Sequence, residues 1–213
     1  MNVKFLNKKK FIFFICGVIF IIIIFVLFFI NFNNRNYKNL NIGNNNSNKT
    51  LEEVEQYILN INSFEATLEV TIKSNKTTNK YVISQKHNKN EDIQEVIEPD
   101  NVKGVKLIYK DNILKVENTK LSLESIYNNY PYIEDNNLWL NSFIAEYKNS
   151  SNKNISEQGE NIIMKIKVKD GNKVGYKQLF LDKKTLIPTK LLIQDNDKNE
   201  IIYILYNKIE LSY

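Results

Sequence analysis

An uninterrupted apolar run near the N-terminus limits the structures that this chain can form. Residues 11–30, FIFFICGVIFIIIIFVLFFI, contain no charged side chain and nothing more polar than the thiol of Cys16. As an α-helix rising about 1.5 Å per residue, the run would be roughly 30 Å long, the thickness of a bilayer's hydrocarbon core. Because a helix satisfies its own backbone hydrogen bonds and lipid offers none, the run predicts a single transmembrane helix.

The charges beside this run predict its orientation. Four lysines and no acidic residue precede it: Lys4, Lys8, Lys9 and Lys10. Positively charged flanks stay in the cytoplasm, so we expect the N-terminus to lie in the cytoplasm and the remainder of the chain to lie outside it. The predicted parts are a cytoplasmic basic tail (1–10), the transmembrane helix (11–30), a flexible Asn-rich linker (31–49) and an extracytoplasmic domain (50–213).

The N-terminal region has two alternative interpretations, a cleaved signal peptide and a lipoprotein anchor. A cleaved signal peptide would have a shorter apolar region followed by small residues, whereas residues 31–39 read NFNNRNYKN. Lipidation of Cys16 would require a small residue before it, and Ile15 stands there. We therefore expect an uncleaved anchor in which Cys16 is a small apolar residue.

Charge and rare residues exclude several function classes. Seven of the 29 basic residues precede Thr50 while all 24 acidic residues follow it, so the exterior domain has a net charge of −2 and nucleic acid is not an expected partner. With one Cys and one His in the chain, neither an intramolecular disulfide nor a Cys/His zinc site can form. We expect no metal, no cofactor and no catalytic residue.

Hydrophobic periodicity predicts a mainly β domain with two helical parts. Residues 51–61 have helical spacing behind a capping-box pattern, Thr50-x-x-Glu53. Period-two alternation then predicts about nine or ten antiparallel strands. The segments are 63–72, 80–87, 91–98, 105–110, 113–118, 162–169, 175–182, 187–195 and 199–211. Residues 121–130 are apolar without alternation, and residues 137–147 are predicted to be helical.

An aromatic and aliphatic stripe marks the second helical segment. Its members are Trp139, Leu140, Phe143, Ile144 and Tyr147. One interpretation is that the stripe fills the core beneath the sheet. The other is that it lines an apolar cavity or contacts a partner, and these five residues are our candidate ligand- or partner-binding set.

Two further candidate sites are weak. His87 lies in the polar stretch KHNKN, which predicts a solvated surface residue. Asp195, Asp197 and Asn199 have the spacing of a calcium loop, but Glu200 and Tyr206 occupy its Gly and Glu positions, so a strand-connecting turn is expected.

Three stretches carry a family resemblance. They are LEEVEQYILNINSFEATLEVTI, then EVIEPDNVKGVKLIY with DNILKV, and LFLDKKTLIPTKLLIQDNDKNEIIYILYNKIEL. Their order resembles the LolA/LolB-like lipoprotein carriers, and most of all the GerS-type germination lipoproteins of clostridia. The resemblance implies an α+β, mainly β fold. Its curved antiparallel sheet would form an unclosed barrel with helices on the concave face. Cys16 lacks the lipobox of those lipoproteins.

The same resemblance implies a non-enzymatic role. GerS-type proteins act with a cell-wall amidase, so the expected partners are the membrane, through the anchor, and an amidase needed for spore cortex modification and germination. The alternative is a carrier or sensor that holds an acyl chain in the concave cavity. A lipid and a second copy of the chain are the other partners we consider.

Overall fold

The computed structural model describes residues 49–74, 76–118, 120–130, 137–170 and 173–213. The predicted basic tail, transmembrane helix and most of the linker lie outside the described residues. None of the helices in the described part of the chain combines the length and the apolar character that a bilayer crossing requires.

The first helix of the domain, α2 (Leu51–Leu59), begins where the capping box predicts. Thr50 Oγ1 accepts a hydrogen bond from the Glu53 backbone N–H at 3.2 Å, and Glu53 Oε2 accepts one from the Thr50 N–H at 2.7 Å. These bonds satisfy two backbone donors that a helix start leaves unpaired. The helix ends at Leu59, two residues earlier than expected, with Asn60 as its cap.

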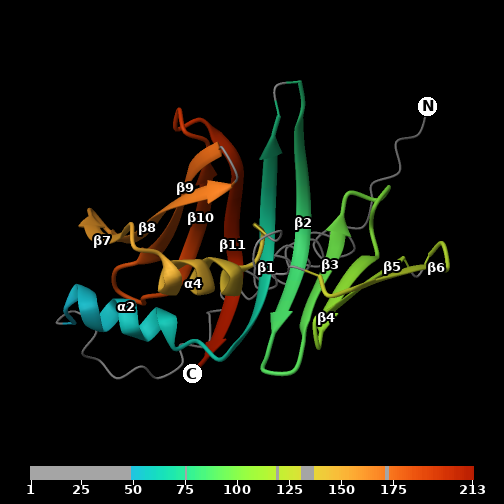
Figure 1. The fold of residues 1–213 in the computed structure, drawn as a ribbon, viewed down its shortest axis with the longest axis horizontal. Helices are drawn as coiled ribbons and strands as arrows, with labels where there is room; N and C mark the ends of the chain where they lie inside the picture. The colour runs from blue at the N-terminus through green and yellow to red at the C-terminus, as the bar shows by residue number, and fades with distance from the viewer. Residues whose placement is uncertain (1–48, 75, 119, 131–136, 171–172) are drawn as a thin grey trace, which may run out of the picture. The chain divides into compact units, whose positions relative to one another are not determined.

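The described strands form one antiparallel sheet of eleven members. The strands are β1 (Ser63–Lys73), β2 (Thr78–His87), β3 (Asp92–Glu98), β4 (Val105–Lys110), β5 (Ile113–Asn118), β6 (Leu123–Asn128), β7 (Lys153–Gln158), β8 (Asn161–Asp170), β9 (Lys173–Asp182), β10 (Pro188–Gln194) and β11 (Glu200–Ser212). Their order is β6-β5-β4-β3-β2-β1-β11-β10-β9-β8-β7. The sheet is thus two meanders joined where the first strand pairs with the last. Its outermost strands, β6 and β7, do not pair, so the curved sheet stays unclosed (Figure 1).

The connection from β6 to β7 positions the second helix. Because these strands are the two ends of the sheet, the chain between them must cross the sheet, and α4 (Leu140–Asn149) lies on this crossing. Figure 1 shows α4 in front of the central strands, with α2 beside it on the same face. The predicted helix 137–147 therefore exists, but it starts three residues later and ends two residues later.

The alternation of apolar and polar residues predicts the strands that bury one face in the core, but it does not predict the two edge strands, β6 and β7. All six residues of β6 are exposed, and β7 has no buried residue. Without one face in the core, neither strand needs alternating apolar residues. The strand count of nine or ten is therefore too low. Between β4 and β5, Asp111 and Asn112 form the expected hairpin turn, with φ of 51° and 64°.

The core lies between the two helices and the concave face of the sheet. Its buried residues come from both meanders and both helices, and include Val54, Ile58, Phe64, Leu68, Met164, Ile166, Leu179, Leu181, Leu191 and Ile204. The helices on the concave face, the curved sheet and its open edges agree with the predicted fold class for the described domain.

Candidate binding site

A tight turn sets the geometry of the β2–β3 hairpin. Asn88 Oδ1 accepts hydrogen bonds from the backbone N–H groups of Asn90 at 2.8 Å and Glu91 at 3.1 Å. This side-chain capping of the turn is a common use of Asn. It places His87, the last residue of β2, directly opposite Asp92, the first residue of β3.

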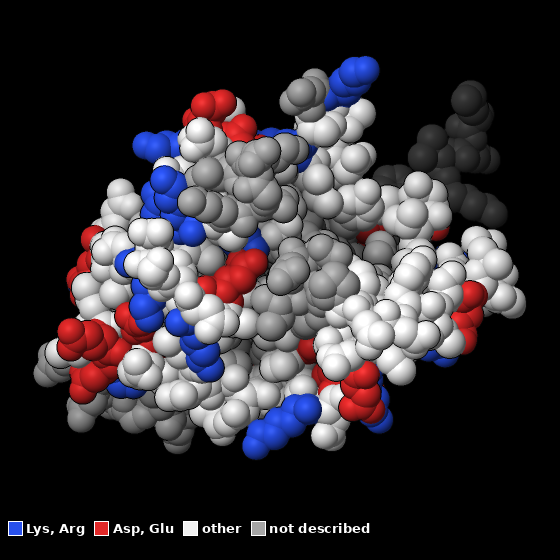
Figure 2. All heavy atoms as spheres, in the orientation of Figure 1, with Lys and Arg blue, Asp and Glu red and all other residues white. Residues whose placement is uncertain are grey.

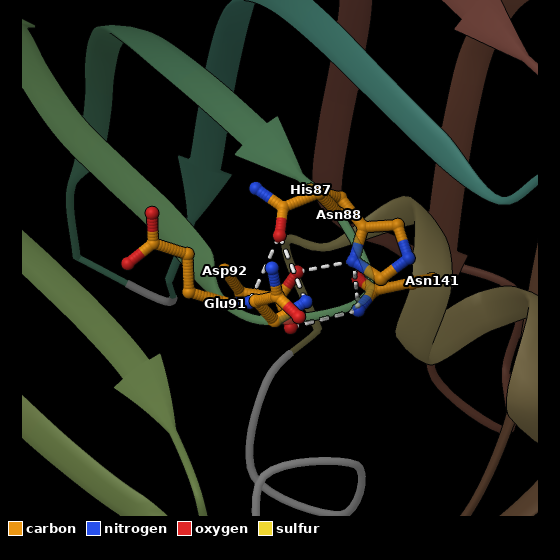
Figure 3. Close-up of polar contacts among 6 residues, drawn as sticks. His87, Asn88, Glu91, Asp92 and Asn141 are labelled. Atoms are coloured by element: carbon orange, nitrogen blue, oxygen red, sulfur yellow. Dashed lines mark hydrogen bonds and ion pairs between the residues drawn. The ribbon is translucent and has the colours of Figure 1, made fainter.

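His87 and Asp92 meet Asn141 from the first turn of α4 (Figure 3). His87 Nδ1 donates to Asp92 Oδ1, because a carboxylate can only accept. Asn141 Nδ2 donates to Asp92 Oδ2 at 3.1 Å and lies 3.3 Å from His87 Nδ1. We call these three residues the polar latch, since they connect α4 to the β2–β3 hairpin.

The expectation that His87 is a solvated surface residue is wrong. Only 20% of its side chain is exposed, and its ring lies against Phe64 of β1 with 5.3 Å between ring centroids. The pairing of β1 with β2 places Phe64 and His87 opposite each other on the concave side of the sheet. The polar sequence around His87 belongs to the turn that follows it, whereas His87 itself points inward.

A second polar contact lies on the same face of β2 and β3, at the next pair of inward-facing residues. Gln85 Nε2 donates to Gln94 Oε1 at 3.1 Å and to the Leu138 carbonyl at 2.9 Å, just before α4 begins. Gln85 and Gln94 are both buried. Buried amides are stable when hydrogen-bonded, so the two glutamines hold the entry of α4 at a defined place on the sheet.

The three residues of the polar latch help to line a cleft of about 330 Å³. Its lining residues are Ile61, Phe64, His87, Asp92, Asn141, Ile144, Ala145 and Lys148. The lining thus combines aliphatic and aromatic side chains with an imidazole, a buried carboxylate and an amide, and it includes the exposed Lys148 at the end of α4. This combination can bind a small group that has an apolar body and a hydrogen-bonding end.

The predicted aromatic and aliphatic stripe is divided between core and cleft. Trp139, Leu140, Phe143 and Tyr147 are each at most 1% exposed. Burial raises the pKa of the Tyr147 hydroxyl well above its usual range, which keeps it neutral. Ile144 also lines the cleft.

Among the described residues, the cleft has no assembled catalytic set. His87 and Asp92 have the arrangement of a base and its orienting acid, but no lining residue carries the hydroxyl or thiol of a nucleophile. In the same part of the chain, no three His, Cys, Asp or Glu side chains gather as metal ligands would. The calcium-like spacing near residue 197 is the expected turn, in which Asp195 Oδ1 accepts from the Asn199 N–H at 2.8 Å.

Sequence reasoning missed the polar latch although part of the signal was present. Because side chains alternate between the two faces of a strand, Ile83, Gln85 and His87 lie on the same face of β2. The burial of Ile83 therefore indicates that His87 also points toward the core. The third member, Asn141, is 49 residues from Asp92, and no local pattern connects them.

Comparisons with known proteins agree with the predicted fold. No family model and no curated protein matches the chain. The GerS lipoprotein, solved in complex with the CwlD amidase from Clostridioides difficile, is 23% identical, with a TM-score of 0.50 over 76% of this chain and 96% of the GerS chain. A LolA superfamily protein from Nitrosomonas europaea matches with 12% identity and a TM-score of 0.46, over 78% of this chain and 94% of its own. MucB, solved with MucA from Pseudomonas aeruginosa, matches with 11% identity and a TM-score of 0.43, over 79% of this chain and 57% of that chain.

The domain has a LolA-like fold related to that of GerS. The match covers nearly the whole GerS chain, and the sheet and the two helices described above form the matching architecture. The resemblance of the three sequence stretches to this fold family is therefore confirmed.

Proposed function

We propose that this chain is a non-enzymatic, membrane-anchored binding protein whose exterior domain binds a cell-wall amidase. The GerS chain, whose fold it shares, forms a complex with the CwlD amidase. By analogy with that complex, the domain presents or stabilises an amidase outside the cytoplasm. Its biological role would be to support spore cortex modification and germination.

Packing beneath α4 is the observation that favours a protein partner over lipid carriage. Leu140, Phe143 and Tyr147 belong to the same buried cluster as Leu68 of β1 and Met164 of β8. The space between helix and sheet is thus filled by side chains at this point. Ligand cavities typically measure about 300–1,000 Å³, and the cleft beside α4 is at the lower end of that range.

A lipid carrier or sensor is the second candidate, and the apolar residues that line the cleft favour it. Ile61, Phe64 and Ile144 could contact the end of an acyl chain, while Lys148 could contact an anionic headgroup. Ile144 would then be the member of the predicted binding set that touches the ligand. Against this, the Asp92 carboxylate in the same lining would disfavour a long apolar chain.

The predicted anchor completes the proposal. Residues 11–30 would hold the protein in the cell membrane as a single-pass helix with its N-terminus in the cytoplasm. Residues 31–49 would let the domain reach a partner near the membrane.

Affinity capture of the full-length protein from sporulating cells tests the proposal. Bound proteins and extracted lipids are both identified by mass spectrometry, and binding of the purified amidase from the same cells is then measured directly. An amidase that co-purifies and binds one-to-one supports the proposal. A stoichiometric lipid with no amidase would support the carrier function instead.

A further inference from the structure

Exposed apolar side chains are concentrated at one end of the sheet. Seven large apolar residues among those described are at least 37% exposed, and five of them lie in β5, β6 and their connection. We call these five the β6 patch: Ile113 (40%), Leu121 (64%), Leu123 (61%), Ile126 (57%) and Tyr127 (52%). A cluster of exposed apolar side chains of this kind indicates an interaction surface.

The patch covers both faces of the edge strand. Tyr127 is paired with Leu114 on one face, and Ile126 is paired with Lys115 on the other. An edge strand exposed to water usually carries charged or polar side chains on its solvated face. In β6, apolar side chains instead project on both sides of a backbone whose outer edge has no neighbouring strand among the described residues.

The other edge of the sheet is protected. Strand β7 is polar, and its Lys153 Nζ lies 2.8 Å from Glu55 Oε1 of α2, which packs beside it. Both α2 and α4 lie over the half of the domain that contains β7, far from β6 (Figure 1). The exposure of β6 is thus a property of one edge, not of the sheet in general.

The charges around the patch cancel. Residues 113–128 contain two lysines and two glutamates, a net charge of zero. Lys115 Nζ lies 3.0 Å from Glu117 Oε2 and 2.8 Å from Glu124 Oε2, and these contacts raise the pKa of the lysine. In Figure 2 the part of this end that faces the viewer is mostly uncharged surface. A neutral surface complements an uncharged apolar partner and offers little attraction to an anionic membrane.

From these observations we infer that β6 is the docking strand for the amidase partner. The partner would add an extended, uncharged apolar segment of its own to this edge. Backbone hydrogen bonds would extend the sheet, and Leu123, Ile126 and Tyr127 would contact alternate side chains of the added strand. The inference rests on the proposed function, because it identifies where that partner binds.

The test uses the full-length protein in lipid nanodiscs and the purified amidase from the same cells. Leu123→Gln and Ile126→Gln remove the apolar contacts on the two faces of β6. Ile201→Gln, on β11 and 37% exposed, is the matched control. We expect at least tenfold weaker binding for both β6 variants, unchanged binding for the control, and slower amide hydrogen exchange in residues 123–128 when the amidase is bound. Circular dichroism of each variant checks that it is folded.

Three other results of this test would each contradict a different claim. If the unmodified protein binds the amidase and both β6 variants bind equally well, the docking strand is wrong while the proposed function stands. If the unmodified protein does not bind the amidase, the proposed function fails, and the assigned partner fails with it. If the β6 variants instead abolish self-association or binding to phosphatidylglycerol vesicles, the occupant is a second copy or a membrane surface, and the assignment to the amidase is overturned.

Discussion

Lys177 of β9 forms a largely buried ion pair with Glu146 of α4. Its Nζ donates to Glu146 Oε1 at 2.7 Å, and only 6% of the lysine side chain and 15% of the glutamate side chain are exposed. The polar latch connects the same helix to β3 through Asn141. Two separate polar contacts therefore hold α4 on the concave face, one to each half of the sheet.

Breaking this ion pair should destabilise the domain strongly. Lys177→Met leaves the Glu146 carboxylate poorly solvated and unpaired, for which we expect a loss of about 3–5 kcal/mol in the free energy of unfolding. Urea unfolding of the full-length protein measures this loss. The double variant Lys177→Met/Glu146→Leu should recover most of it, and a single variant as stable as the unmodified protein would contradict the buried ion pair.

Removing the Asn141 side chain should loosen the start of α4. Asn141→Ala deletes the hydrogen bond to the buried Asp92 carboxylate, and bonds to charged groups contribute about 1.5–3 kcal/mol. We expect a stability loss of that order and faster amide exchange in residues 140–144. Asn149→Ala, at the exposed end of the same helix, should change neither. Equal exchange in the two variants would argue against the polar latch.

Truncation of the aromatic stripe should separate core from binding surface. Trp139 and Phe143 are each 1% exposed, so Trp139→Ala and Phe143→Ala should cost about 3–5 kcal/mol each and lower the melting temperature markedly. Binding of the amidase per folded molecule should stay unchanged. Near-normal melting temperatures with weakened binding would instead place these two side chains at the partner surface.

The predicted topology has a direct test in intact protoplasts. The four lysines before residue 11 and the absence of acidic residues there predict an N-terminus inside. Protease added from outside should digest residues 31–213 and leave an N-terminal epitope tag protected. Protection of the C-terminal domain would show that the orientation is reversed.

Cys16 should have no role in anchoring. If it is an apolar residue within a transmembrane helix, Cys16→Ala should leave membrane association and apparent mass unchanged. Metabolic labelling with a radioactive fatty acid is the measurement. Label that is incorporated into the unmodified protein and lost in Cys16→Ala would establish a lipoprotein anchor.

Local patterns were sufficient for much of this fold. The capping box and helical spacing predicted α2, because Thr50 and Glu53 act within one helical turn. Alternation predicted the central strands, because one face of each is buried and the other is solvated. The three resembling stretches then predicted the LolA-like arrangement, which the match to GerS supports.

Only the tertiary structure decided which faces are covered and which distant residues meet. The aromatic stripe is visible in the sequence, but its helical spacing does not show which part of the protein packs against it. In the structure, the connection from β6 to β7 crosses the sheet, and Phe143 and Tyr147 are therefore buried in the core. Strands β6 and β7 lack alternation because edge strands need no buried face. The polar latch depends on the strand register that places His87 opposite Asp92 and on Asn141, which lies 49 residues after Asp92, so its existence does not follow from local sequence.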